Sequence, residues 1–186
     1  MKIPDQAKRV FKGKIFDVYQ WEQEMFDGST ATFEMLQRPG TVEVIAIKDN
    51  LIWYADEEQP SKGKFLSFFG GRIEAGEAPE AAAKRELLEE AGMASNDWEL
   101  FLTKDSFGKI YWLNYLFIAR NCTNHREQTL DSGEKIRVVS CTFEEFIQKI
   151  LNQEINTFPH VTIAIMNYQY REPGKLEEFK KKLGLV

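Results

Sequence analysis

The stretch FFGGRIEAGEAPEAAAKRELLEEAGM, residues 68–93, decides how the rest of the chain is interpreted. It opens with paired glycines and continues into a run of alanine, leucine and charged residues that favour helix. Pro79 suits the first helical turn, where its missing N–H has no helical partner to lose, and Gly92 suits the residue that ends a helix. The sequence therefore predicts a glycine-rich loop that leads into a helix.

Three glutamates of the predicted helix, Glu86, Glu89 and Glu90, fall within one arc, because successive residues are about 100° apart around a helix. Arg85 can pair with Glu89 one turn later, but one cation does not neutralise all three and Glu77 as well. A divalent metal does, and carboxylate oxygens are the ligands that Mg²⁺ and Mn²⁺ prefer. A solvated surface helix with the same glutamates is the alternative that composition leaves open.

The spacing is more specific than the charge. Gly71 is followed after five residues by Glu77, after seven more by Arg85-Glu86-Leu87, and then by Glu89-Glu90 and Gly92. This pattern resembles the Nudix box and matches it at every defined position. The resemblance implies an α/β/α sandwich with a mixed sheet, and hydrolysis of a nucleoside diphosphate linked to another group.

The resemblance also assigns the metal ligands. Glu86 and Glu90 correspond to the principal ligands, and Glu89 to a further ligand or a catalytic group that orients water. The backbone carbonyl of Gly70 or Gly71 corresponds to another ligand. Two or three Mg²⁺ ions, or Mn²⁺ in their place, are implied with substrate, since bridging metals neutralise a pyrophosphate and lower the pKa of water.

Arg85 and Glu77 correspond to a pair that, together with Gly71, locks the loop onto the helix. Arg85 therefore belongs with the catalytic group. The resemblance also implies that Gly71 and Arg72 lie at the loop position that faces the substrate.

Outside the box, the chain is similar to the ADP-ribose and nucleoside-diphosphate-sugar pyrophosphatases. The similarity rests on an N-terminal hairpin, the turn Arg38-Pro39-Gly40, the strand TVEVIAI and the pair Glu58-Gln59. It implies a homodimer that exchanges the hairpin extension of residues 1–40, followed by a hydrolase domain of residues 41–186. Tyr19 and Trp21 are then candidates for holding the nucleobase, with ordinary sheet packing as the alternative, and Arg38 is a candidate for a phosphate or base contact.

A polar stretch at residues 121–135 ends in LDSGEK, just before a predicted strand. Glu134 stands where the ADP-ribose and nucleoside-diphosphate-sugar pyrophosphatases have a loop carboxylate that activates or orients the attacking water. Asp131 is the second candidate for this role. A solvated loop charge is the equally weighted alternative. Inline attack on one phosphorus releases a nucleoside monophosphate and a sugar phosphate.

Two departures keep broader nucleotide-sugar hydrolysis open. The chain has Ser106-Phe107-Gly108 where ADP-ribose hydrolases carry a Ser-Pro-Gly turn, and Pro60 where they often carry an arginine. Other nucleoside-diphosphate substrates, RNA 5′ pyrophosphate removal and non-catalytic sensing are further alternatives. The net charge of −5 argues against a broad nucleic-acid surface, and the intact box argues against a sensor.

With 186 residues, 43% of them hydrophobic, the chain can form one domain with an extension. No apolar run is long enough for a membrane span and the N-terminus lacks a signal-peptide pattern, so we expect a cytoplasmic protein. Cys122 and Cys141 show no metal-ligand spacing.

Hydrophobic alternation and turn residues predict the remaining elements. A hairpin is expected from residues 9–25 and 30–38, and a surface loop at 56–64. Strands are expected at residues 41–48, 51–55, 98–103, 110–119 and 136–142. Helices are expected at 143–151 and 160–170, with a short one after residue 174.

Overall fold

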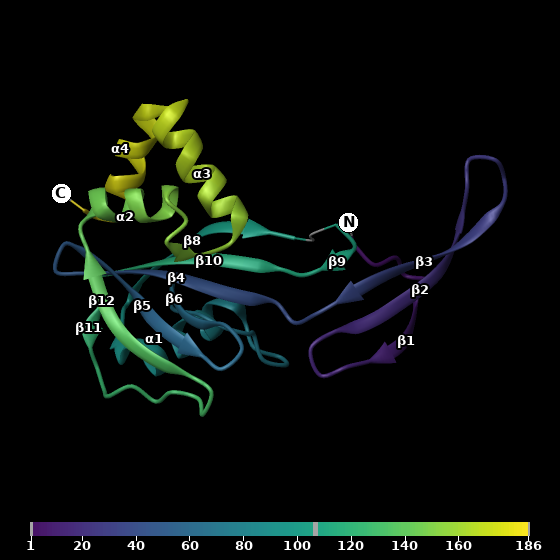
Figure 1. The fold of residues 1–186 in the computed structure, drawn as a ribbon, viewed down its shortest axis with the longest axis horizontal. Helices are drawn as coiled ribbons and strands as arrows, with labels where there is room; N and C mark the ends of the chain where they lie inside the picture. Colours follow the sequence, from purple (N-terminus) through teal and green to yellow (C-terminus); the bar gives the residue numbers. More distant parts are fainter. Residues whose placement is uncertain (1, 106–107, 186) are drawn as a thin grey trace.

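The computed structural model describes residues 2–105 and 108–185. Ser106 and Phe107 of the predicted turn triplet lie outside the described residues. Figure 1 shows a sheet covered by helices on both faces, and a separate group of strands that extends away from this body. The predicted α/β/α sandwich with a mixed sheet and an N-terminal extension is confirmed.

The central sheet has seven strands, in the order β13-β6-β5-β4-β10-β8, with β12 paired to β5. The pairs β4 with β10 and β6 with β13 are parallel and the others antiparallel. The strands are β4 (Thr41–Lys48), β5 (Leu51–Gln59), β6 (Gly63–Ser67), β8 (Asp97–Lys104), β10 (Asn114–Arg120), β12 (Lys135–Cys141) and β13 (Ile155–Asn156).

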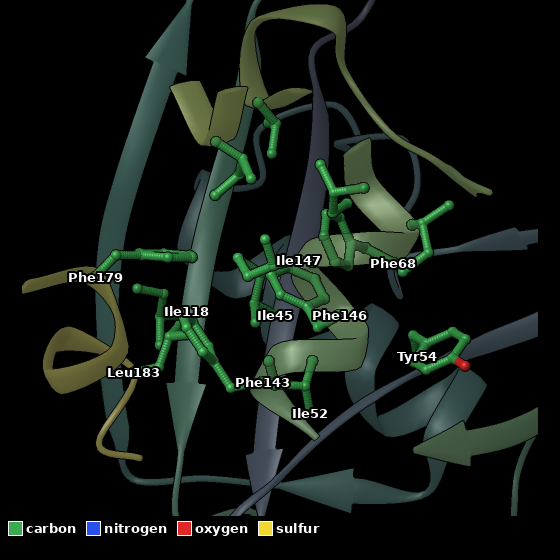
Figure 2. Packing of buried hydrophobic residues seen from close by; sticks show 14 of the residues in the cluster. Ile45, Ile52, Tyr54, Phe68, Ile118, Phe143, Phe146, Ile147, Phe179 and Leu183 are labelled. Carbon is green, nitrogen blue, oxygen red and sulfur yellow. The ribbon is translucent and has the colours of Figure 1, made fainter. Parts of the chain in front are cut away.

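The helix α1 (Pro79–Ala91) covers one face of this sheet, and α2 (Phe143–Leu151), α3 (Pro159–Tyr170) and α4 (Pro173–Lys182) cover the other (Figure 1). Alternate residues of a strand point to opposite faces. Ile45 and Ile118 accordingly join the core beneath α2, where Figure 2 shows them beside Phe146 and Ile147. Neighbouring strand residues such as Val44 and Phe117 join a second core beneath α1.

The extension is a four-stranded sheet of β1 (Lys8–Lys12), β2 (Asp17–Glu24), β3 (Thr30–Gln37) and β9 (Ile110–Tyr111). The antiparallel pair of β2 and β3 confirms the predicted hairpin. The run at residues 9–25 is two strands rather than one, because the chain turns where the Gly13 N–H donates to the Phe16 carbonyl at 3.0 Å.

The predicted surface loop at residues 56–64 is wrong. β5 continues to Gln59 and β6 begins at Gly63, so only residues 60–62 form the turn. The polar composition is compatible with strand because its charges pair with β12: Asp56 with Arg137, and Glu58 with Lys135 at 3.8 Å. This correction places three additional acidic residues, Asp56, Glu57 and Glu58, in the central sheet.

The other predicted elements are confirmed with small shifts at their ends, except that the run at residues 110–119 is interrupted between β9 and β10. Two short strands that were not predicted, β7 (Met93–Ala94) and β11 (Thr123–Asn124), pair with each other. Both cysteines are buried, and Cys141 lies in β12 as expected. Over the described residues, no helix is long and apolar enough to cross a membrane.

Gly92 ends α1 with a φ of 64°, and its N–H donates to the Leu88 carbonyl at 3.1 Å. A Cβ at this position would lie 2.2 Å from the carbonyl oxygen of Arg126. Both the left-handed backbone and the close approach therefore require glycine.

We predict that Gly92→Ala destabilises the fold more than Gly63→Ala, measured as the free energy of unfolding in urea. Gly63 has a similar φ of 71°, but its Cβ would meet no described atom within 4 Å. The control should cost about 1–2 kcal/mol from backbone strain alone. The contact with Arg126 should add about 1–3 kcal/mol for Gly92→Ala. Equal losses in the two variants would contradict the role given to this contact.

Candidate active site

The glycine-rich loop and α1 together form one side of a charged cleft of about 420 Å³. Pro79 begins α1 after an extended Ala78, and the glutamates that line the cleft follow about two to three turns later. The charged side chains that line the cleft come from α1, from the loop before it, from the end of β3 and from the loop before β12. They are Arg38, Arg72, Glu74, Arg85, Glu86, Glu89, Glu90, Asp131 and Glu134.

Arg85 joins the loop to the helix. Its Nε and Nη2 donate to the two carboxylate oxygens of Glu77 at 2.9 and 3.0 Å, which is a bidentate pair. Nη1 donates to Glu86 at 2.8 Å and to Glu89 at 3.1 Å, and Nη2 also reaches the Arg72 carbonyl at 3.1 Å. The hydrogen bonds that Arg85 donates lower the pKa of Glu77. The pKa of Arg85 is raised in turn, and its hydrogen bonds to Glu77 are the largest cause.

The paired glycines let the loop lie directly against the helix. A Cβ on Gly71 would come within 2.5 Å of a Glu86 carboxylate oxygen, and one on Gly70 within 2.1 Å of the Val42 carbonyl. The Gly70 N–H donates to Glu90 Oε2 at 2.8 Å. The Gly71 carbonyl accepts from the Val42 N–H at 2.9 Å, which favours Gly70 over Gly71 as a backbone metal ligand.

Burial makes negative charge costly in this cleft. Desolvation raises the pKa of Glu86 to about 7, opposed by the charge of Arg85. Glu90 is only 5% exposed, and its burial raises its pKa well above the ordinary value, with Glu86, Glu134 and Glu57 adding to the effect. Burial also raises the pKa of Glu134. A divalent cation would offset this cost, since it favours the charged forms.

The donor set fits a hard divalent cation, because it consists of carboxylate and carbonyl oxygens. No three acidic, histidine or cysteine side chains of the described residues are already gathered around one metal position. Glu86 and Glu89 are hydrogen-bonded to Arg85 instead, and Glu90 to the Gly70 N–H.

The structure brings Glu134 and Asp131 to the same cleft as the helix glutamates. Their loop is held by a hydrogen bond from the Glu134 N–H to the Asp131 carbonyl at 3.0 Å. Arg38 and Arg72 also reach the cleft, and they lie close enough for the charge of Arg72 to add to burial in lowering the pKa of Arg38.

Tyr19 and Trp21 are not brought to this cleft within one chain. Trp21 is 7% exposed, and its ring lies 6.0 Å from that of Phe33 in the extension. For Trp21, therefore, the contacts within the chain are those of sheet packing.

Two acidic residues near the site were not identified from the sequence. Glu57 of β5 is 7% exposed and accepts a hydrogen bond from Ser67 Oγ at 2.8 Å. Glu43 of β4 accepts one from Thr157 Oγ1 at 2.5 Å. The sequence offers a signal for Glu43, because a glutamate inside the otherwise apolar strand TVEVIAIK is unusual. It offers none for Glu57, because that residue falls in the stretch 56–64 that the composition predicts to be a loop.

Comparison with known proteins agrees with this geometry. The family model of the NUDIX domain matches residues 37–161. The chain is 27% identical over 154 residues to an ADP-ribose pyrophosphatase from Bacillus subtilis (strain 168), which covers 80% of this chain and 82% of that protein. It is 26% identical over 174 residues to a methanol dehydrogenase activator from Bacillus methanolicus, covering 91% and 94%.

Among solved structures, an ADP compounds hydrolase superposes with a TM-score of 0.70 at 20% identity and covers 98% of this chain and 95% of that one. This likeness concerns the fold. The family match extends over most of the chain, and the chain therefore belongs to the Nudix family. It is a Nudix pyrophosphohydrolase of the kind that the box predicted.

We predict that Glu86→Gln stabilises the metal-free protein at pH 8 but not at pH 4. Because the pKa of Glu86 is raised in the folded state, its ionisation lowers stability as the pH rises from the ordinary value of 4.5 through about 7. Glutamine removes that loss, by about 1–3 kcal/mol. Urea unfolding in EDTA at both pH values measures the difference, and a gain that is equal at pH 4 and pH 8 would show that the charge is not its cause.

Proposed function

We propose that the protein hydrolyses the pyrophosphate bond of ADP-ribose or a related nucleoside diphosphate sugar in a metal-dependent reaction. The products are a nucleoside monophosphate and a sugar phosphate. The observation that carries this proposal is the cleft that the glutamates of α1 line together with Arg38 and Arg72. The name of the Bacillus subtilis relative supports the substrate class.

Glu86, Glu90 and the Gly70 carbonyl are the residues that would hold Mg²⁺ or Mn²⁺, with Glu89 as a further ligand. When bound, two or three such ions neutralise the pyrophosphate and lower the pKa of the attacking water. The two arginines would bind the phosphates, since the planar guanidinium matches phosphate oxygens in pairs.

Glu134 is the better placed of the two loop carboxylates to orient water and accept its proton. It is partly buried beside Glu89 and Glu90, whereas Asp131 is exposed. Its raised pKa brings it closer to neutral pH, where a general base is most effective. Arg85 holds Glu77, Glu86 and Glu89 in one arrangement, and so keeps the helix and loop in register for the reaction.

The extension would form a homodimer and contribute to nucleobase binding. Val10 and Phe11 of β1 are apolar but 53% and 60% exposed, which suits a surface that a second copy covers. Ile15 is also exposed, and it lines the charged cleft, so the extension already reaches the site. Tyr19 is more accessible than Trp21 and is the better candidate for a base contact from a partner chain.

We predict that Glu90→Gln lowers kcat by about 100-fold or more. Mutating residues that only support a metal ligand already lowers metal affinity or activity by about 10–100-fold. Glu80→Gln is the matched control: it is a glutamate of the same helix that pairs with Lys84 on the surface at 2.6 Å. The assay is release of monoester phosphate from ADP-ribose. Comparable activity in both variants would show that the carboxylate cleft is not the catalytic site.

We also predict EDTA-sensitive cleavage of nucleotide sugars within a panel of ADP-ribose, ADP-glucose, UDP-glucose, GDP-mannose and NADH. Preference for ADP-ribose would mean that Pro60 is tolerated in place of arginine, and similar rates for several sugars would identify a broad nucleotide-sugar hydrolase. A triphosphorylated oligonucleotide belongs in the same panel. Faster cleavage of that RNA end, or no cleavage of any nucleotide sugar, would contradict the proposal.

A further inference from the structure

Arg38 lies where the extension joins the central sheet. The segment 38–40 carries the chain from β3 of the extension into β4 of the central sheet, and the segment 112–113 makes the same crossing between β9 and β10. The two segments are joined by a hydrogen bond from the Arg38 N–H to the Tyr111 carbonyl at 3.2 Å. This crossing brings Trp112 beside Arg38.

The Arg38 guanidinium lies over aromatic rings. Its central carbon is 4.3 Å from the centroid of the Trp112 ring and 5.7 Å from that of Phe16. A cation–π contact attracts a cation to the ring but occupies none of the acceptors that its N–H groups seek. The five donors of the guanidinium therefore stay available for a ligand.

The donors of Arg38 are also short of acceptors in the protein. Its Nε is buried and, over the described residues, has no hydrogen-bond partner. Arg85, in contrast, is paired with carboxylates. Burial, and after it the charge of Arg72, lowers the pKa of Arg38. A partly buried guanidinium with an open donor beside a second arginine suits an anion.

Trp112 is itself held firmly. Its Nε1 donates to Thr41 Oγ1 at 3.1 Å, and its ring meets the Phe158 ring edge to face with the centroids 5.9 Å apart. Its carbonyl accepts from Nδ2 of the fully buried Asn114 at 3.0 Å. A fixed indole can order the long side chain of Arg38 before a ligand arrives, and this lowers the entropic cost of binding.

We propose that Trp112 is a positioning residue for the hydrolysis, and that it acts by holding the Arg38 guanidinium ready for the phosphates of the substrate. Arg38 lines both the charged cleft and a neighbouring cleft of about 510 Å³, which Trp112 also lines. The inference rests on the proposed function, because it takes phosphate as the group that Arg38 binds. It deepens that function by naming the residue that prepares this arginine.

The test is a double-mutant cycle on binding of methylenediphosphonate, a pyrophosphate analogue that is not hydrolysed. Its Kd is measured calorimetrically in Mg²⁺ for the wild type, Arg38→Met, Trp112→Leu and the double variant. Arg38→Met should weaken binding by about tenfold or more. Trp112→Leu should weaken it by about 3- to 30-fold, as loss of a cation–π contact predicts. The double variant should bind no more weakly than Arg38→Met, because Trp112 then has no guanidinium to position.

Trp53→Leu is the matched control. Trp53 also carries a cation–π contact, with Lys48 at 4.9 Å, but it lines neither cleft, so this variant should keep the wild-type Kd. Trp112→Phe retains a ring and should weaken binding less than Trp112→Leu. Thr41→Val removes only the hydroxyl that fixes the indole, and it takes the place of Trp112→Leu in the cycle if that variant does not fold.

Three results would overturn the positioning role. They are an unchanged Kd in Trp112→Leu, a further loss of the same size when Trp112→Leu is added to Arg38→Met, and no binding of the diphosphonate by the wild type. Equal losses in Trp112→Phe and Trp112→Leu would exclude the ring as the cause. The readout needs no turnover. Binding that follows the predicted cycle in a protein that cleaves no nucleotide sugar would instead overturn the proposed function, so the two failures are distinguishable.

Discussion

The burial of acidic side chains from α1 and from the loop before β12 in one cleft is the constraint on which the site depends. Glu86, Glu90 and Glu134 lie in a cleft where burial raises the pKa of each, and Arg85 is shared among Glu77, Glu86 and Glu89. A single guanidinium cannot balance this charge. The protein tolerates the arrangement because the rest of the fold holds it in place, and a bound cation would offset the cost of burying these charges.

The fold holds this arrangement through close backbone contacts. Gly70 and Gly71 bring the loop between Val42 of the sheet and the carboxylates of α1, at distances that no Cβ permits. Leu87 and Ala83 on the other side of α1 are fully buried against the sheet, so the helix cannot move away from the loop. The large core under α2 and α3 stabilises the opposite face of the same sheet (Figure 2). The charged cleft is thus built on rigid elements, as a preorganised site requires.

Much of this was predictable because the box combines a local structural pattern with a chemical one. Helix spacing placed Glu86, Glu89 and Glu90 on one side, and a loop position placed Glu134, which the structure brings to the same cleft. The continuation of β5 through Glu57 was missed, because its acidic residues resemble a loop until the cross-strand partner Arg137 is known. The cleft that Glu43 and Thr157 line could not be predicted, because these two residues are 114 positions apart in the sequence. Contacts at that separation depend on how β4 packs against the segment between β13 and α3, which no local spacing encodes.

Proton release on metal binding tests the central role of the carboxylate cleft most directly. Isothermal titration of Mg²⁺ at pH 7, in two buffers with different ionisation enthalpies, counts the protons displaced. Because burial raises the pKa of Glu86 to about 7 and that of Glu90 well above its ordinary value, metal binding should release protons. Binding without proton release, or no binding at all, would contradict the conclusion that these buried glutamates hold the metal.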